Sequence, residues 1–64
     1  MDFAHLSRLL WRERDLLDTL LFKLHEQNLL LTAGDAEWLP RASREIEAVL
    51  ERVGEIELER AVEF

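Results

Sequence analysis

A seven-residue repeat of large apolar residues runs through the first half of this 64-residue sequence. The members of its main line follow one another without a gap: Phe3, Leu10, Leu17, Leu24 and Leu31. A repeat of seven keeps side chains on one face of an α-helix and is typical of helices that pack along their length. The pattern predicts a long amphipathic helix over residues 2–33, with Leu17 and Leu24 in its core.

Apolar residues also fill much of the three lines beside this one on the helix surface. These lines contain Leu6, Leu9, Leu16, Leu20, Leu21 and Leu30, with Glu13, Lys23 and Gln27 as polar exceptions. About four-sevenths of the circumference is therefore largely apolar, whereas the seam of a two-stranded coiled coil needs two positions in seven. One partner helix cannot cover such a wide arc.

A turn is predicted at Ala33-Gly34-Asp35, because Gly commonly ends a helix in the left-handed conformation and Asp is a favoured first cap of the next. A second helix is then expected over residues 35–62, antiparallel to the first because the connection is short. Pro40 leaves an alternative open. The regular helix could begin at Pro40, where the fixed φ of proline is favourable, with residues 35–39 forming a separate turn.

The second helix carries a narrower apolar stripe than the first. Its members alternate in steps of three and four, and Leu50 widens the stripe: Leu39, Ala42, Ile46, Val49, Val53 and Ile56. This helix leaves several leucines of the first uncovered, and burying each contributes roughly 1.5–3 kcal/mol. The predicted fold is an all-α, coiled-coil-like antiparallel two-helix hairpin that pairs with a second copy into a four-helix bundle.

The expected protein interface comprises the apolar side chains that one partner helix cannot cover, together with two tryptophans. Trp11, Phe22 and Leu29 face away from the main stripe and suggest a second apolar strip, and Trp38 is expected to fold over the turn. Replacing Leu17 or Leu24 by Glu is expected to bury an unpaired charge and to cost several kcal/mol. The full predicted interface is Leu9, Trp11, Leu16, Leu17, Leu20, Leu21, Phe22, Leu24, Leu29, Leu30 and Trp38.

No pattern for catalysis, a metal or a cofactor is present in the sequence. His25-Glu26 is followed by Leu29 rather than by the second His of a zinc-protease motif, and neither His has a Glu three residues before it. The net charge of −6 argues against nucleic acid or an anionic membrane as a partner. With no Cys, no signal-peptide pattern and no long apolar run, the sequence predicts a soluble, cytoplasmic, non-enzymatic protein.

The stretch from Leu9 to Val53 resembles the N-terminal helical hairpin of FlgN-type flagellar export chaperones. The resemblance rests on the Leu-rich first helix, the turn Ala33-Gly34-Asp35, the following Trp38-Leu39, and the charged run Ser43-Arg44-Glu45-Ile46-Glu47. It implies a non-enzymatic protein that keeps secreted hook–filament junction subunits soluble until export. Family members carry a further C-terminal helical region thought to hold the cargo, so this chain is either a fragment or a reduced relative.

Two other functions fit the same residues. The chain could be a structural dimerisation module whose apolar stripe is covered by its own copy. It could also be a small acidic inhibitor or adaptor whose second helix masks a basic surface of a regulatory protein. All three functions depend on protein–protein contacts, with a homodimer expected.

Overall fold

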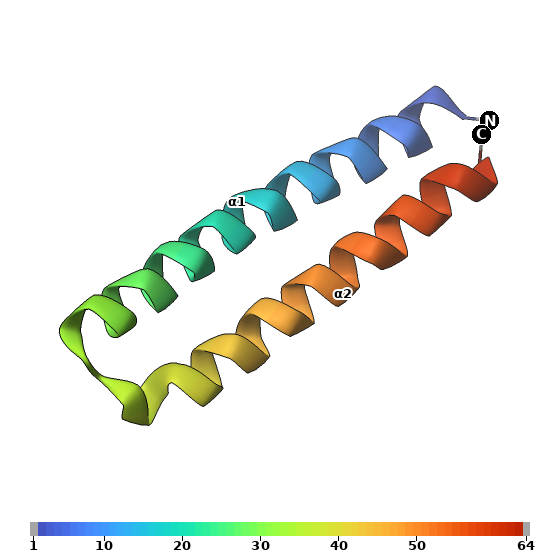
Figure 1. Cartoon of the computed structure of the whole chain (residues 1–64). Helices are drawn as coiled ribbons and strands as arrows, with labels where there is room; N and C mark the ends of the chain where they lie inside the picture. Colours follow the sequence, from blue (N-terminus) through green and yellow to red (C-terminus); the bar gives the residue numbers. More distant parts are fainter. Residues whose placement is uncertain (1, 64) are drawn as a thin grey trace.

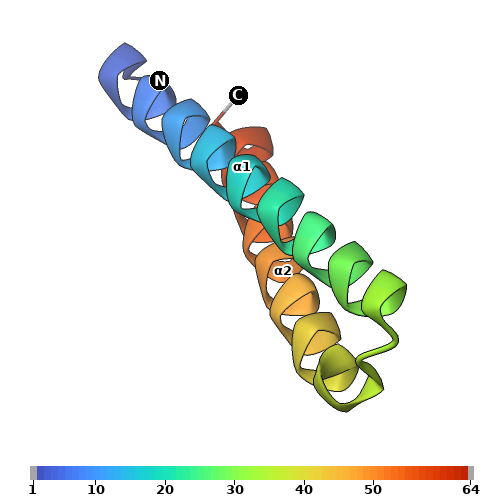
Figure 2. The same ribbon diagram turned by 90° about the vertical axis from the view of Figure 1, so that its left-hand side faces the viewer.

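The computed structural model describes residues 2–63 and shows a helical hairpin, which confirms the predicted fold class. Helix α1 spans Phe3–Ala33, the short 3-10 helix η1 spans Ala36–Trp38, and helix α2 spans Leu39–Glu63 (Figure 1). The two long helices run antiparallel, so the start of α1 and the end of α2 lie at the same end of a rod of 48 × 15 × 10 Å. In the view turned by 90°, the helices cross at a shallow angle (Figure 2).

Both ends of α1 are closed by hydrogen bonds that the sequence provides. At the start, the Asp2 carboxylate accepts a hydrogen bond of 3.1 Å from the backbone N–H of Ala4. At the end, Gly34 adopts the left-handed conformation with φ of 71°. The N–H groups of Gly34 and Asp35 then donate to the carbonyls of Leu31 and Leu30. This closing motif satisfies two carbonyls that would otherwise lack a partner and turns the chain back.

Helix α2 does not start at Asp35, and the second of the two alternatives for Pro40 is close to what the structure shows. Residues Ala36–Trp38 form the separate 3-10 turn, and α2 begins at Leu39 with Pro40 in its first turn. A continuous helix from Asp35 would need Pro40 to donate a backbone hydrogen bond that proline cannot make. The Asp35 side chain makes no capping hydrogen bond, contrary to expectation.

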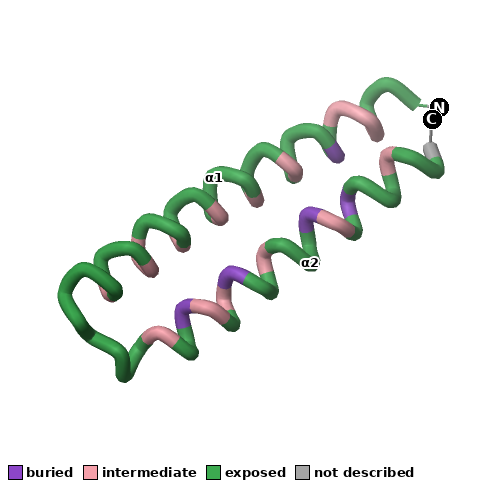
Figure 3. Tube along the Cα trace, in the orientation of Figure 1, coloured by how far each residue is buried: buried purple, intermediate pink, exposed green. Residues whose placement is uncertain are grey.

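The core lies along the line where the two helices face each other (Figure 3). The most buried side chains are Leu9 and Ile56, each 1% exposed, and they are joined by Ala42, Ile46 and Val53. On α1 the side chains of this seam alternate in steps of three and four, and all are buried or half-buried: Leu6, Leu9, Glu13, Leu16, Leu20, Lys23, Gln27 and Leu30. The seam of α1 therefore contains three polar residues.

The uninterrupted leucine line is not part of this core, so the prediction for Leu17 and Leu24 is wrong. Their side chains are 46% and 44% exposed. Helix α2 packs instead on the two lines of α1 that form the seam, one through Leu20 and one through Leu9. For each polar residue in these two lines, α2 supplies a polar partner. A Glu at position 17 or 24 would keep access to water, so the unfolding free energy of the hairpin should change little.

Candidate protein-binding faces

Three polar pairs connect the helices across the seam. The Nζ atom of Lys23 lies 2.9 Å from Oε1 of Glu45, and the amide of Gln27 donates to the Ser43 hydroxyl at 3.2 Å. Nearer the open end, Nε of Arg60 lies 3.1 Å from Oε2 of Glu13. The first two pairs are hydrogen bonds, and the third is an ion pair whose two buried atoms make no hydrogen bond, so each polar group in the seam of α1 has a polar partner on α2.

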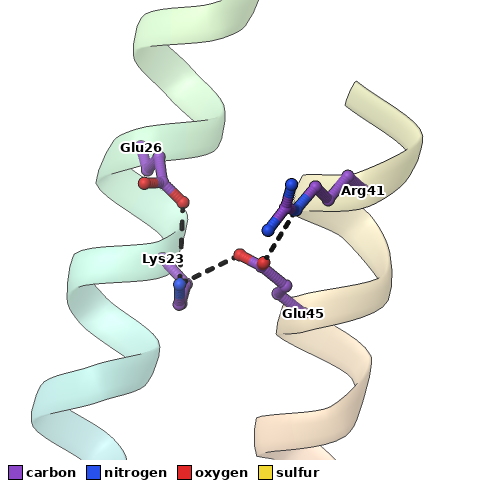
Figure 4. Close-up of polar contacts among 4 residues, drawn as sticks. All are labelled: Lys23, Glu26, Arg41 and Glu45. Carbon is purple, nitrogen blue, oxygen red and sulfur yellow. Dashed lines mark hydrogen bonds and ion pairs between the residues drawn. The ribbon is translucent and has the colours of Figure 1, made fainter. Parts of the chain in front are cut away.

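The pair of Lys23 and Glu45 is part of a four-residue network beside the turn (Figure 4). Lys23 also lies 3.8 Å from Glu26, and Arg41 lies 3.3 Å from the second oxygen of Glu45. The hydrogen bond with Lys23 and then that with Arg41 hold the pKa of Glu45 below its ordinary value of 4.5. The same bond to Glu45 raises the pKa of Lys23 above 10.5.

These shifts predict a decrease in stability at both ends of the pH scale. Because the pKa of Glu45 is lower in the folded state, its contribution is complete above the unfolded value near 4.5 and is lost as pH falls through the folded value. The contribution of Lys23 is complete below 10.5 and is lost as pH rises through its raised value. Thermal melts of the Glu45→Gln variant should show a smaller acid-induced decrease than wild type. Equal acid sensitivity in both proteins would contradict this assignment.

A row of half-exposed leucines follows one edge of the hairpin, and we call it the leucine face. The seven-residue line of α1 that runs from Leu10 to Leu31 lies on the helix surface beside the seam line that contains Gln27. Gln27 in turn contacts Ser43 on α2. Leu50 is seven residues after Ser43, so α2 presents it at this same edge. The leucine face consists of Leu10, Leu17, Leu24, Leu31 and Leu50, which are 44 to 57% exposed.

A second apolar surface, the outer strip, lies on the side of α1 away from the seam. It consists of Trp11, Leu21, Phe22 and Leu29, all 60 to 64% exposed. Leu21, Phe22 and Leu29 line an open hollow of about 420 Å³, whose rim carries Asp18, His25 and Glu26. Trp11 lies in a smaller hollow beside Arg14, whose guanidinium is 5.3 Å from the ring centre.

The predicted interface residues divide among these surfaces, and the structure does not gather them into one site. Four face α2 in the seam, namely Leu9, Leu16, Leu20 and Leu30. Leu17 and Leu24 lie in the leucine face, and Trp11, Leu21, Phe22 and Leu29 form the outer strip. Trp38 is 47% exposed and lines a hollow with Leu30 and Ala42 at the turn.

Leu10, Leu31 and Leu50 belong to the leucine face but were not part of the predicted interface. Leu10 and Leu31 belong to the same seven-residue line as Leu17 and Leu24, so that line was the signal that could have found them. The position of Leu50 beside this line depends on which edge of α2 faces Gln27, which the sequence does not show.

Within residues 2–63 there is no group of three or more His, Cys, Asp or Glu side chains placed to hold a metal ion. No helix described there has the length and apolar content needed to cross a membrane. The candidate sites are the leucine face and the outer strip, whose exposed apolar side chains can pack against other protein surfaces.

The family model described as FlgN protein matches residues 1–64. Searches of curated proteins and of solved structures gave no significant match.

Proposed function

The chain belongs to the FlgN family, a family of flagellar export chaperones, and from this premise we propose that it binds the helices of secreted hook–filament junction subunits. In this role the chain would keep a subunit soluble in the cytoplasm until type III export. The observation that carries the proposal is the leucine face, because its five leucines lie along the edge where α1 and α2 meet and the hairpin itself leaves them about half exposed.

Geometry and energy both favour a helix as the occupant of the leucine face. Its five leucines lie along the edge between two antiparallel helices, and an amphipathic helix laid along that edge would contact both. Complete burial of a Leu side chain contributes about 1.5–3 kcal/mol, and these side chains have roughly half of that still to gain. Five such contributions are enough to support a specific complex after the cost of association.

The test is to refold a purified hook–filament junction subunit with and without the chain and to follow its aggregation by light scattering. Wild type should suppress aggregation and co-elute with the subunit in gel filtration. The double variant Leu17→Ser/Leu24→Ser should lose both effects while keeping the helical circular dichroism spectrum of wild type, with a lower melting temperature because both side chains are already about half buried in the hairpin. Leu58→Ser is the matched control, since Leu58 is 69% exposed on α2 outside the leucine face.

Two results would contradict the proposal. One is suppression of aggregation that is equal in wild type and in the double variant. The other is loss of suppression in Leu58→Ser to the same degree as in the double variant, which would indicate non-specific apolar adhesion.

A second candidate function is self-association through the same face. The face contains leucines from both helices, so two hairpins meeting there would bury α1 and α2 of each copy and form a four-helix bundle. The chain would then be a structural dimerisation module. Sedimentation of wild type and of Leu17→Ser/Leu24→Ser in the absence of any subunit separates the two candidates, because this candidate requires wild type to be a dimer and the variant to be a monomer.

A further inference from the structure

We propose that the leucine face selects its partner helix by charge, through Glu47 and Glu57 on α2. The helix that fits has an apolar stripe against the leucines and two Lys or Arg residues, about eleven positions apart, on the flank that faces α2. The inference rests on the proposed function in one respect, namely that a helix of another protein occupies the leucine face.

The edge of the leucine face that α2 provides carries charge of one sign. Glu57 is seven residues after Leu50 and continues its line along the helix. Val53, three residues after Leu50, is buried in the seam, so Gly54, four residues after Leu50, lies on the side away from the seam. Glu47 is seven residues before Gly54 and shares its line. The two carboxylates therefore border the face on its α2 side.

Both carboxylates can reach a partner in the leucine face. Glu47 and Glu57 are exposed, and within residues 2–63 neither shares an ion pair with another described side chain. Their ten-residue separation corresponds to about 15 Å along α2. Two cations eleven positions apart on a partner helix have nearly the same spacing, about 16 Å, and point to one side because eleven residues make about three turns.

Gly54 lies between the two carboxylates and leaves the edge low at that point. Its backbone is helical, with no positive φ, and a Cβ atom there would meet nothing within 4 Å. The packing of the hairpin therefore does not require glycine, which weakens the interior of a helix. A partner helix benefits from it, because its backbone can approach α2 between Glu47 and Glu57 and bring both cations within reach of them.

The edge of the face that α1 provides has the opposite sign. Beside the leucines, on the side away from the seam, α1 carries a line in which Arg14 is the one charged residue. This line consists of Ser7, Arg14, Leu21 and Asn28. A helix with cations on one flank is therefore expected to bind in the direction that places them along α2, because the reverse direction brings them toward Arg14 and away from the two carboxylates.

The test uses two synthetic amphipathic peptides that share one leucine stripe. One has Lys at two positions eleven apart on one flank, and the other has Glu at the same positions. Fluorescence anisotropy should show that wild type binds the Lys peptide about tenfold more tightly at low salt, with a smaller difference at high salt. Glu47→Lys/Glu57→Lys should reverse the preference. Gly54→Gln should melt at a higher temperature than wild type and bind the Lys peptide several-fold more weakly.

The matched control is Glu51→Lys/Glu55→Lys, which changes the net charge by the same amount outside the two lines that border the face. This variant should still prefer the Lys peptide. All four glutamates are exposed, and circular dichroism checks that each variant is folded.

Three results would overturn the proposal. They are equal binding of the two peptides at low salt, weak or strong; a control variant that loses the preference as completely as Glu47→Lys/Glu57→Lys; or Gly54→Gln that binds the Lys peptide as tightly as wild type.

Retention of the hook–filament junction subunit is measured separately, so the two proposals can fail independently. If Glu47→Lys/Glu57→Lys retains the subunit as wild type does while Leu17→Ser/Leu24→Ser does not, the selection by charge fails and the chaperone function stands. A chain that discriminates between the peptides as expected but retains no subunit gives the opposite conclusion.

Discussion

Replacing Leu9 or Ile56 by Ala should cause the largest loss of stability of any single change in the hairpin. Both side chains are 1% exposed, and truncation of such a residue costs about 2–5 kcal/mol through lost burial and the cavity left behind. A domain of this size has a total stability near the lower end of the range of about 5–15 kcal/mol. Each variant should therefore show a large decrease in melting temperature and a partly unfolded population at 37 °C, measured by circular dichroism.

Leu58→Ala provides the control for this result. Leu58 is 69% exposed, so its truncation should change the unfolding free energy by no more than about 0.5 kcal/mol. If Leu9→Ala and Leu58→Ala melted at the same temperature, this would contradict the packing of α2 against the side of α1 that carries Leu9.

Removal of one partner from the pair of Glu13 and Arg60 should give the second-largest effect. Nε of Arg60 and Oε2 of Glu13 are both inaccessible to water and lie 3.1 Å apart, and neither takes part in a hydrogen bond. Glu13→Ala leaves the arginine without its counter-charge. A fully buried orphan costs about 3–5 kcal/mol, but the Arg60 side chain is 35% exposed and can turn toward water, so we expect about 1–2 kcal/mol.

The double variant Glu13→Leu/Arg60→Leu should reverse this loss. Two apolar side chains at these seam positions need no desolvation of charge, and such replacements are neutral or stabilising by about 1–4 kcal/mol. Urea denaturation of wild type, both single variants and the double variant forms a thermodynamic cycle that measures the coupling. A coupling energy near zero would show that the pair contributes nothing to the fold.

The three polar pairs also fix how the helices are aligned. The pair of Lys23 and Glu45 lies near the turn, that of Gln27 and Ser43 lies beside it, and that of Glu13 and Arg60 lies toward the open end. Sliding α2 by one helical turn would separate all three pairs at once. The polar residues thus reduce the apolar area of the seam and favour one alignment over the others.

The helices and the turn could be predicted from local sequence, whereas the faces by which the two helices pack together could not. The seven-residue repeat and Gly34 depend on residues near one another in the chain, and they indicate a hairpin without further information. The choice of seam depends on Arg60, Glu45 and Ser43, which lie 16 to 47 residues from their partners. The line of α1 through Leu17 contains only apolar residues, so the sequence alone favours it as the line that packs against α2. The true seam contains Glu13, Lys23 and Gln27, and these residues fit a seam only once their partners on α2 are known.

The candidate site could be predicted in part from the sequence. The imbalance between a wide apolar arc on α1 and a narrow one on α2 was visible in the sequence, and the exposed leucines of the structure agree with it. The division of that excess into a leucine face and an outer strip required the position of α2. The resemblance to FlgN-type chaperones, carried by residues 9–53, is confirmed by the family match over residues 1–64.

Nuclear magnetic resonance of the leucine and isoleucine methyl groups, during titration with a hook–filament junction subunit, tests the central claim most directly. We predict that the resonances of Leu10, Leu17, Leu24, Leu31 and Leu50 shift or broaden together. Those of the buried Ile56 and of Leu58 should change little. Saturable changes confined to Leu58 or to the outer strip, with the five leucines unaffected, would contradict the assignment of the leucine face as the chaperone surface.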